Sequence, residues 1–192
     1  MENIWFTSDN HFSHKNISNF CPRTRPDKDP DTMNEKMITV WQEQVQPQDR
    51  VYLLGDVFFC NAHNAATLLD RLPGQKYLVY GNHDKVIRSN KHLRDRFVSV
   101  EEYKEIVVEG VQVVLFHYPI LEWNRCHRGA YALFGHVHGQ YDRHPITSRY
   151  RTMDVGIDSR PHDSNKDKPL YSLWSWREVN SILKDREIMT HH

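Results

Sequence analysis

The stretch Ile4–His11 (IWFTSDNH) begins with a short apolar run and ends in two side chains of metal-binding type, Asp9 and His11. The shortness and the aromatic content of the run favour a buried β-strand over a helix. Asp9 and His11 are two residues apart, so an extended backbone points both side chains to the same side. Whether this is chance or a site depends on the rest of the chain.

Four further apolar runs end in the same way. In open α/β sheets, ligands bind at the carboxyl ends of the strands, so five such ends predict one shared site. Three of these ends carry a glycine, which lets the backbone turn tightly beside a crowded centre. The four runs are 51–54, 77–80, 111–116 and 131–134, and they are followed by Gly55-Asp56, Gly81-Asn82-His83-Asp84, His117 and Gly135-His136-Val137-His138.

Helical patterns between the early runs predict an α/β fold. A stripe of apolar residues from Met33 to Val45 has helical spacing, residues 62–72 form a second candidate that ends at Pro73-Gly74, and 84–97 form a third. The second half has more strand-like segments, with a hairpin expected to turn at Glu109-Gly110 and further strands at 152–155 and 171–176. Residues 21–31 and 156–169 lack apolar periodicity and are expected to be long loops.

Composition limits the class of protein. The 192 residues fit a single domain, 1–192, and with 39% hydrophobic residues the chain is able to bury a core. It has no apolar run of the roughly 18–20 residues that a membrane span needs, and its first residues do not predict a secretory signal. A net charge of 0 argues against a basic face over the whole domain. Cys21, Cys60 and Cys126 are widely spaced and odd in number, which favours a reducing, cytoplasmic location. His191 and His192 are consistent with the remnant of a tag.

The strand ends together supply seven ligands, which are too many for one tetrahedral zinc ion and suit two metals that share a carboxylate. Imidazole and carboxylate donors without a thiolate favour metals such as Mn, Fe, Zn or Ni over Ca or Mg, and Mn is the expected cofactor. Two divalent ions, two aspartates and a bridging hydroxide leave a positive centre, which favours a phosphate substrate and a metal-activated water. The candidates are Asp9, His11, Asp56, Asn82, His117, His136 and His138.

These motifs, in this order, resemble the calcineurin-like metallophosphoesterase superfamily. More narrowly, residues 4–14 and the Arg-Pro loop that follows resemble small single-domain phosphoesterases of bacteria and bacteriophages, and the resemblance covers about residues 4 to 158. It implies a four-layer sandwich of two mixed β-sheets flanked by helices. It also implies that Asp9, His11, Asp56 and His138 hold one metal, and that Asp56, Asn82, His117 and His136 hold the other, with Asp56 bridging.

The resemblance further implies that His83 contacts the phosphate and protonates the leaving oxygen as a general acid. The alternative is that His83 only makes a hydrogen bond behind a ligand. Asp84 is expected to be structural, as an acceptor behind the site or as a helix N-cap. One position departs from the protein Ser/Thr phosphatase branch, because Phe59 stands where that branch has a second Asp. This argues against protein phosphatase activity and leaves open which group orients His83.

Substrate contacts are expected from Asn82, His83, Arg23, Arg25 and His14. The two arginines follow the first ligand pair and are suited to grip a phosphate, although surface salt bridges with the neighbouring aspartates are equally compatible with the sequence. His14 is expected beside the metal ligands. Other side chains carry weaker expectations: Tyr118 and Trp123 either stack on a base or belong to the core, and Arg143, Arg149 and Arg151 either meet a polynucleotide or are ordinary surface residues.

The sequence therefore predicts a phosphodiesterase that acts on a nucleotide, a cyclic nucleotide or a nucleic-acid end through attack by a metal-bridged hydroxide. A phosphomonoesterase is the alternative within the same chemistry. Two readings of another class are a scaffold that keeps the fold without activity and a protein that metals merely stabilise. The intact ligand set and the presence of His83 favour the enzyme. The native metal, the substrate and the oligomeric state stay open.

Overall fold

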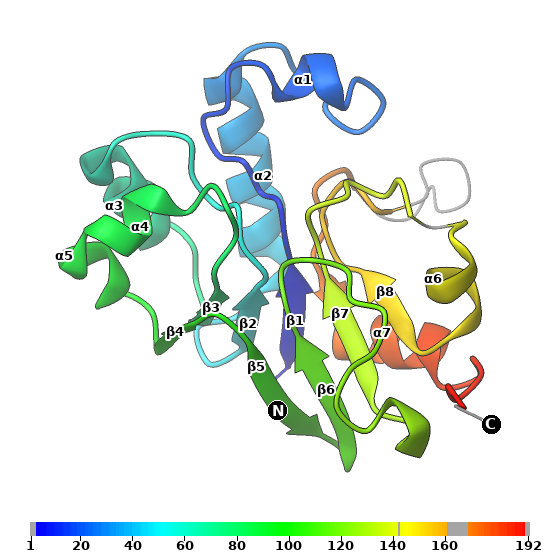
Figure 1. The fold of residues 1–192 in the computed structure, drawn as a ribbon. Coiled ribbons are helices and arrows are strands. Elements are labelled where there is room, and N and C mark those ends of the chain that lie inside the picture. Colours follow the sequence, from blue (N-terminus) through cyan, green and yellow to red (C-terminus); the bar gives the residue numbers. More distant parts are fainter. Residues whose placement is uncertain (1–2, 142, 161–168, 191–192) are drawn as a thin grey trace.

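The computed structural model describes residues 3–141, 143–160 and 169–190. Two mixed β-sheets pack face to face, with helices on the outside (Figure 1). The first sheet has the order β4-β3-β2-β1-β9, in which β1 to β4 are parallel and β9 is antiparallel to β1. Its strands are β1 (Ile4–Thr7), β2 (Arg50–Leu53), β3 (Gln75–Val79), β4 (Ser99–Glu101) and β9 (Trp174–Ser175).

The second sheet has the order β5-β6-β7-β8. β5 and β6 form the expected hairpin at Glu109-Gly110, while β6, β7 and β8 are parallel. The strands are β5 (Lys104–Val108), β6 (Val111–Leu115), β7 (Tyr131–Phe134) and β8 (Thr152–Asp154). The predicted α/β class with two mixed sheets is therefore correct, and the strand ends of both sheets that carry candidate ligands meet at one edge of the molecule.

Helices cover the outer face of the first sheet. The longest is α2 (Pro30–Gln44), which starts because the Asp29 side chain accepts a hydrogen bond from the Thr32 backbone N–H at 2.8 Å and Pro30 occupies the first turn. Its predicted stripe, including Met37 and Trp41, is buried against the sheet. The expected loop 21–31 was therefore too long, because Pro30 and Asp31 already belong to this helix. Beside it lie α1 (Ile17–Phe20), α3 (Ala62–Asp70), α4 (Lys85–Ser89) and α5 (Lys91–Arg94).

The single helix expected over 84–97 is divided into α4 and α5. Asn90 lies between them in an extended conformation, and its side chain caps α5 by accepting from the Leu93 N–H at 3.2 Å. The strand expected at 171–176 is also shorter than predicted. It is limited to β9, because Ser175 and Glu178 form a capping box that begins α7 (Trp176–Leu183).

One hydrophobic core lies between the first sheet and its helices, and a second fills the space between the two sheets. Phe6 and Leu54 from the first sheet meet Leu115 and Leu133 from the second, and Val179 of α7 closes the same cluster. On the outer face of the second sheet, the segment around η1 (Cys126–Arg128) supplies the buried Trp123, and α6 (Pro145–Arg149) packs nearby. These layers hold the strands rigidly, which matters because the site is built on the turns that follow them.

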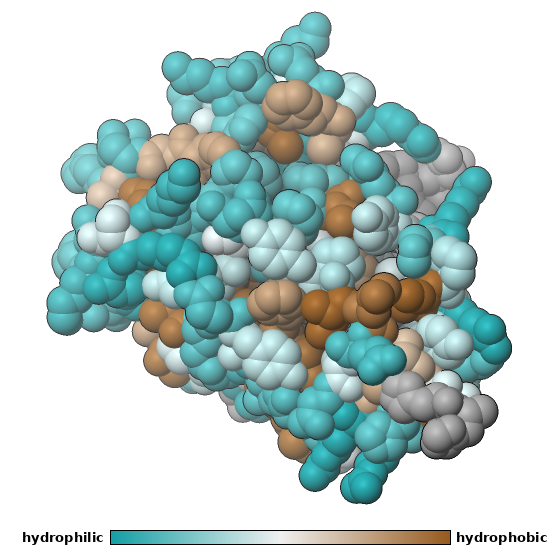
Figure 2. All heavy atoms as spheres, in the orientation of Figure 1, coloured by the Kyte–Doolittle hydropathy of each residue, from teal (hydrophilic) through white to brown (hydrophobic). Residues whose placement is uncertain are grey.

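The face seen in Figure 2 is largely hydrophilic, with an apolar band across its middle at the level of the loop after β6 and of α6. Within the described ranges, no helix combines the length and the apolar character needed to cross a membrane. The proposed tag remnant, His191 and His192, and most of the loop expected over 156–169 lie outside the described residues.

Candidate metal centre

The candidate ligands sit on unusual backbone. Asp9, His11, Asp56, His136 and His138 all adopt positive φ angles, between 49° and 71°. Left-handed conformations are uncommon for residues other than glycine, although Asp and His tolerate them better than most. Such conformations are kept where the surrounding structure holds them in place. Here the Asp9 N–H donates to the Gly55 carbonyl at 3.0 Å, and the His11 N–H donates to the Asp56 carbonyl at 3.0 Å.

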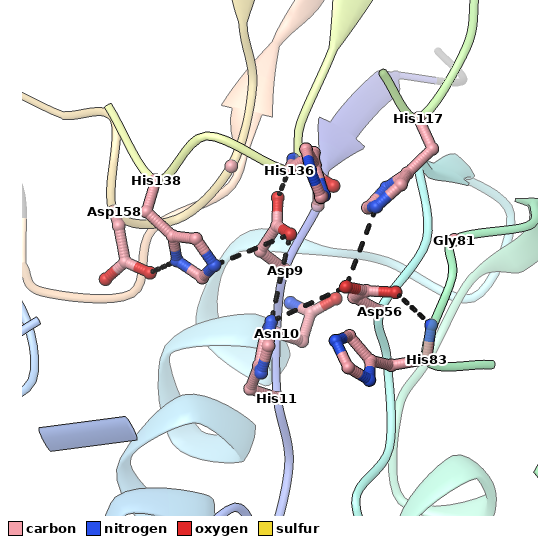
Figure 3. A network of polar contacts seen from close by, with 12 residues as sticks. Asp9, Asn10, His11, Asp56, Gly81, His83, His117, His136, His138 and Asp158 are labelled. Atoms are coloured by element: carbon pink, nitrogen blue, oxygen red, sulfur yellow. Dashed lines mark hydrogen bonds and ion pairs between the residues drawn. The ribbon is translucent and has the colours of Figure 1, made fainter. Parts of the chain in front are cut away.

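One group of ligands consists of Asp9, His11 and His138, whose donor atoms lie within 4.8 Å of one another. His11 Nε2 and His138 Nε2 each lie 3.8 Å from Asp9 Oδ1, so both rings face the same carboxylate oxygen. The second oxygen of Asp9 accepts from the His136 backbone N–H at 2.8 Å, which fixes the carboxylate (Figure 3). These are three of the four residues expected at the first metal.

A second group consists of Asp56, His117 and His136, again within 4.8 Å. Asp56 Oδ2 lies 3.6 Å from His117 Nε2 and 3.9 Å from His11 Nε2, so this carboxylate stands between the two groups. Asn82 belongs to the same corner, because its Oδ1 lies 3.0 Å from His117 Nε2. The arrangement is the one expected if Asp56 bridges two ions.

Buried donor atoms without partners test whether metals fit here. Among the described residues, the buried side-chain polar atoms without a hydrogen bond are Asp9 Oδ1, Asn10 Oδ1 and both ring nitrogens of His11. Leaving polar atoms buried and unpaired costs free energy, and a bound cation would satisfy a carboxylate oxygen and an imidazole lone pair together. Burial also lowers the pKa of His11, which keeps the ring neutral and able to bind metal. The donor set therefore fits divalent ions.

Two glycines are required by close approach to these carboxylates. A Cβ at Gly81 would overlap the Asp56 carboxylate, and a Cβ at Gly135 would overlap the side chains of Ser8 and Asp9. The predicted reason for glycine at these strand ends, a crowded centre, is therefore correct at both positions.

Asp84 holds the turn that presents Asp56. Its carboxylate accepts from the backbone N–H groups of Asp56, Val57 and Gly81 at 2.8–2.9 Å. Its side chain makes no capping hydrogen bond to α4, so of the two structural roles expected, the acceptor behind the site is the correct one. Burial raises the pKa of Asp84 to about 6, and the nearby Asp56 charge adds to the rise, while the three N–H donors oppose it.

His83 points toward the centre from the exposed side (Figure 3). Its backbone N–H donates to Asp56 Oδ1 at 2.8 Å, which places the residue next to the shared carboxylate. Its ring packs against Phe59 at a centroid distance of 5.0 Å. Phe59 also stacks on His11 at 4.7 Å and meets the edge of His14 at 4.1 Å. The residue that replaces the second Asp thus forms an aromatic wall, and His14 contacts both His11 and Phe59.

Arg25 requires a correction. It was expected to grip the substrate or to form a surface salt bridge, but it is fully buried and pairs with Asp158. Its Nε lies 2.8 Å from Asp158 Oδ1 and its Nη2 lies 2.9 Å from Asp158 Oδ2. A guanidinium enclosed in this way has no face to offer a phosphate. Arg23, by contrast, is exposed and lines a cavity of about 360 Å³ beside His138.

Asp158 is the functional residue that the sequence analysis missed. It is buried, and its Oδ2 lies 2.8 Å from His138 Nδ1. Burial opposes its ionisation, but Arg25 and His138 hold the pKa of Asp158 well below the ordinary range. Burial alone would lower the pKa of His138, but hydrogen bonds to Asp158 and Cys21 and the charges of Asp9 and Asp158 outweigh it and raise the pKa to about 10. The available signal was another carboxylate just after a predicted strand, at 152–155.

The weaker expectations are resolved in part. Trp123 belongs to the core, with its Nε1 donating to the Ala130 carbonyl at 2.8 Å. Tyr118 is 38% exposed and packs edge-on against His117 and His136, beside the second group. Arg149 pairs with Glu187 at 2.9 Å, and Arg151 donates to backbone carbonyls near the C-terminus, so both have structural partners.

Comparison with known proteins shows the family of this chain. The profile of the Calcineurin-like phosphoesterase superfamily domain matches residues 3–152. The chain belongs to this superfamily. Phosphoesterases of the superfamily hydrolyse phosphate esters, and the ligand groups described above are its candidate metal centre.

Three proteins are similar to this chain over most of its length. An uncharacterised protein of Methanocaldococcus jannaschii is 30% identical over 162 residues, covering 82% of this chain and 83% of its own. The gene 66 protein of Mycobacterium phage D29 is 28% identical over 187 residues, covering 83% and 89%. A solved structure of a protein of unknown function from Aquifex aeolicus has a TM-score of 0.69 and 27% identity, covering 95% of this chain and all of its own.

Proposed function

We propose that this phosphoesterase hydrolyses a phosphodiester bond with two divalent metal ions, Mn²⁺ first among them, and with His83 as general acid. Two ligand groups, Asp9–His11–His138 and Asp56–His117–His136, carry the proposal. They meet at Asp56, whose Oδ2 faces His117 of its own group and His11 of the other. When bound, the ions would lower the pKa of a water molecule toward neutrality and supply the nucleophile.

Different side chains would bind the metal ions and the substrate. Asp9, His11, Asp56 and His138 would hold one ion, and Asp56, Asn82, His117 and His136 the other. The centre is not evenly accessible: Asn82, His83 and His136 are exposed, whereas Asp9, His11, Asp56 and His117 are buried. The substrate phosphate is therefore expected to approach from the exposed side, with Asn82 and His83 in contact with it.

His83 is suited to act on the leaving group. Its backbone is anchored to Asp56 and its ring is braced by Phe59, so the imidazole has a defined position at the edge of the centre. In the protonated form it would transfer its proton to the leaving oxygen as the P–O bond breaks, and solvent would then reprotonate it. A neutral alcohol then departs in place of an alkoxide.

Two features support a diester over a monoester. A diester carries one negative charge at neutral pH and a monoester carries up to two, so a monoester needs more cationic donors. Arg25, the most deeply placed arginine near the centre, is already neutralised by Asp158. In addition, the cavity beside His138 offers about 360 Å³ for a second substituent on phosphorus, with Phe20 and Arg23 on its wall.

The organic part of the substrate is expected to be nucleotide-derived. Phe20 is 71% exposed at the rim of this cavity, where a planar base has an aromatic face to stack on. His14 and Arg23 would contact the substrate on the same side. The described cysteines, Cys21, Cys60 and Cys126, are all unpaired thiols, which suits the proposed cytoplasmic location.

The test is hydrolysis of bis(p-nitrophenyl) phosphate and p-nitrophenyl phosphate side by side, after metal stripping and reloading with Mn²⁺. The proposal predicts metal-dependent turnover that favours the diester. A preference for the monoester would contradict the diester assignment and leave a phosphomonoesterase. Absence of turnover with Mn, Fe, Zn and Ni, in protein shown to bind two ions, would favour a scaffold of the same fold.

A further inference from the structure

Arg25 is joined to two parts of the first ligand group at once. The loop between α1 and α2 carries this arginine into the interior, where its side chain is 0% exposed. Besides its two hydrogen bonds to Asp158, its Nη2 donates to the Asp9 carbonyl at 2.6 Å and its Nη1 donates to the Asn10 carbonyl at 2.9 Å. The remaining Nη1 hydrogen faces the sulfurs of Met33 and Met37.

These contacts account for all five N–H donors of the guanidinium. Two of them hold the backbone at Asp9 and Asn10, and Asp9 is a ligand whose φ of 54° needs external support. Two others hold the carboxylate of Asp158. A buried arginine with this distribution of donors is fixed in one geometry, and it connects the loop 21–29 to the centre.

Asp158 transmits that geometry to His138. The Asp158 Oδ2 atom lies 2.8 Å from His138 Nδ1, so Nδ1 is occupied by the carboxylate and Nε2 is the ring nitrogen left to bind a metal. Nε2 is the atom that faces Asp9 Oδ1 at 3.8 Å, inside the first ligand group (Figure 3). A carboxylate behind a ligating imidazole orients the ring and makes it a stronger donor.

The second group is supported in a different way. The Nδ1 atom of His117 lies 2.6 Å from the backbone carbonyl of Leu54, which is a neutral acceptor. The buried charge pair therefore serves only one of the two groups.

We propose that Asp158, held by Arg25, is a positioning residue that sets the affinity of the first metal site through His138. This inference rests on the metal-dependent function proposed above. It assigns Arg25 and the loop that carries it to metal binding, in place of the substrate role expected from the sequence. It also predicts that loss of the carboxylate weakens one ion selectively.

The experiment is a Mn²⁺ titration of metal-stripped Asp158→Asn and wild-type protein by calorimetry, with bound ions counted by elemental analysis. We expect two ions in the wild type. In the variant we expect one ion to bind about 10–100-fold more weakly and the other to be unchanged. Asp49→Asn is the matched control, because Asp49 is equally buried but bonds to Trp5 and to backbone N–H groups away from the ligands. We expect it to bind both ions normally.

The outcomes separate the two claims. A wild-type protein that binds no metal contradicts the proposed function itself. Unchanged affinity for both ions in Asp158→Asn, or equal weakening of both, contradicts only the positioning role. If Asp158→Asn does not fold, because Arg25 is left as an uncompensated buried charge, the double variant Arg25→Met/Asp158→Asn removes that charge and the same selective weakening is expected.

Discussion

The two ligand groups of the centre differ in the interactions that hold their side chains in place. Asp9 and His11 are buried and His138 is half-buried, and behind them stands a buried ion pair, Arg25–Asp158. The other group has one exposed member, His136, and its neighbours Asn82 and His83 also face solvent. The difference teaches that a buried charge pair backs the first group alone, while the most exposed side chains of the centre lie in and beside the second group. Asp56 lies between the two groups.

Asp56→Asn is expected to have the largest effect, because it removes the charge that both groups share. We predict a loss of kcat/KM of at least about 10³-fold on a diester substrate, since the remaining ligands act as a unit with this carboxylate. The measurement is steady-state hydrolysis with the metal content checked in the same samples. A loss below tenfold would show that the two groups work separately.

His83→Ala tests the exposed side of the centre alone. We predict a fall in kcat of about 10²–10⁴-fold for esters with a poor leaving group, and a much smaller fall for p-nitrophenyl esters, whose leaving oxygen needs little protonation. Metal stoichiometry should stay at the wild-type value. A loss that is the same for good and poor leaving groups would contradict the general-acid role.

Phe59→Ala is expected to act in the same direction but more weakly. The ring braces His83 and His14 and stacks on His11, so its removal should loosen His83 while keeping every ligand. We predict a loss of about tenfold, again concentrated on poor leaving groups. Phe59→Tyr, which keeps the ring, should stay near wild type. A Phe59→Ala enzyme that loses activity evenly on all esters would assign Phe59 to packing alone.

Glu178→Gln is expected to lower the stability of the fold and to leave the metal centre unchanged. Burial alone would raise the pKa of Glu178, but Arg160 and Ser175 lower it to about 2. A carboxyl with a depressed pKa contributes stability above its ordinary pKa near 4.5, and this contribution is lost as the pH falls toward 2. With its oxygen on Ser175, glutamine keeps the capping box of α7, and it removes the charge and the second acceptor oxygen that faces Arg160.

For this variant we predict a free energy of unfolding about 1 kcal/mol lower at pH 7, after allowing for solvent screening of the ion pair. The difference should shrink as the pH is lowered through 4.5. Urea denaturation at several pH values measures it, and diester hydrolysis should be unchanged. A difference that persists unchanged at pH 3 would contradict the assignment to charge.

Much of the site was accessible from sequence because its residues follow short apolar runs. The pattern predicted that Asp9, Asp56, His117 and His136 would meet, since parallel strands end at a common edge. The structure brings them together, while their roles toward metals stay predictions. The alternation of strands and helices likewise predicted the α/β class and the hairpin at Glu109-Gly110.

The residues that sequence reasoning misjudged depend on distant partners. Arg25 lies in a polar loop with aspartates nearby, which suggests an exposed side chain, yet its counter-charge Asp158 comes 133 residues later. No periodicity links two such positions. The interruption between α4 and α5 is a local effect of Asn90, whose capping hydrogen bond competes with a continuous helix. The left-handed backbone at the ligands follows from tertiary hydrogen bonds that a strand pattern does not contain.

The most direct test of the central claim is the rate of bis(p-nitrophenyl) phosphate hydrolysis as Mn²⁺ is added to metal-stripped protein, plotted against the number of ions bound. If the two groups form one dinuclear centre, turnover should stay low with the first ion and rise as the second one binds. Full turnover with a single bound ion, or no turnover with two, would contradict the account.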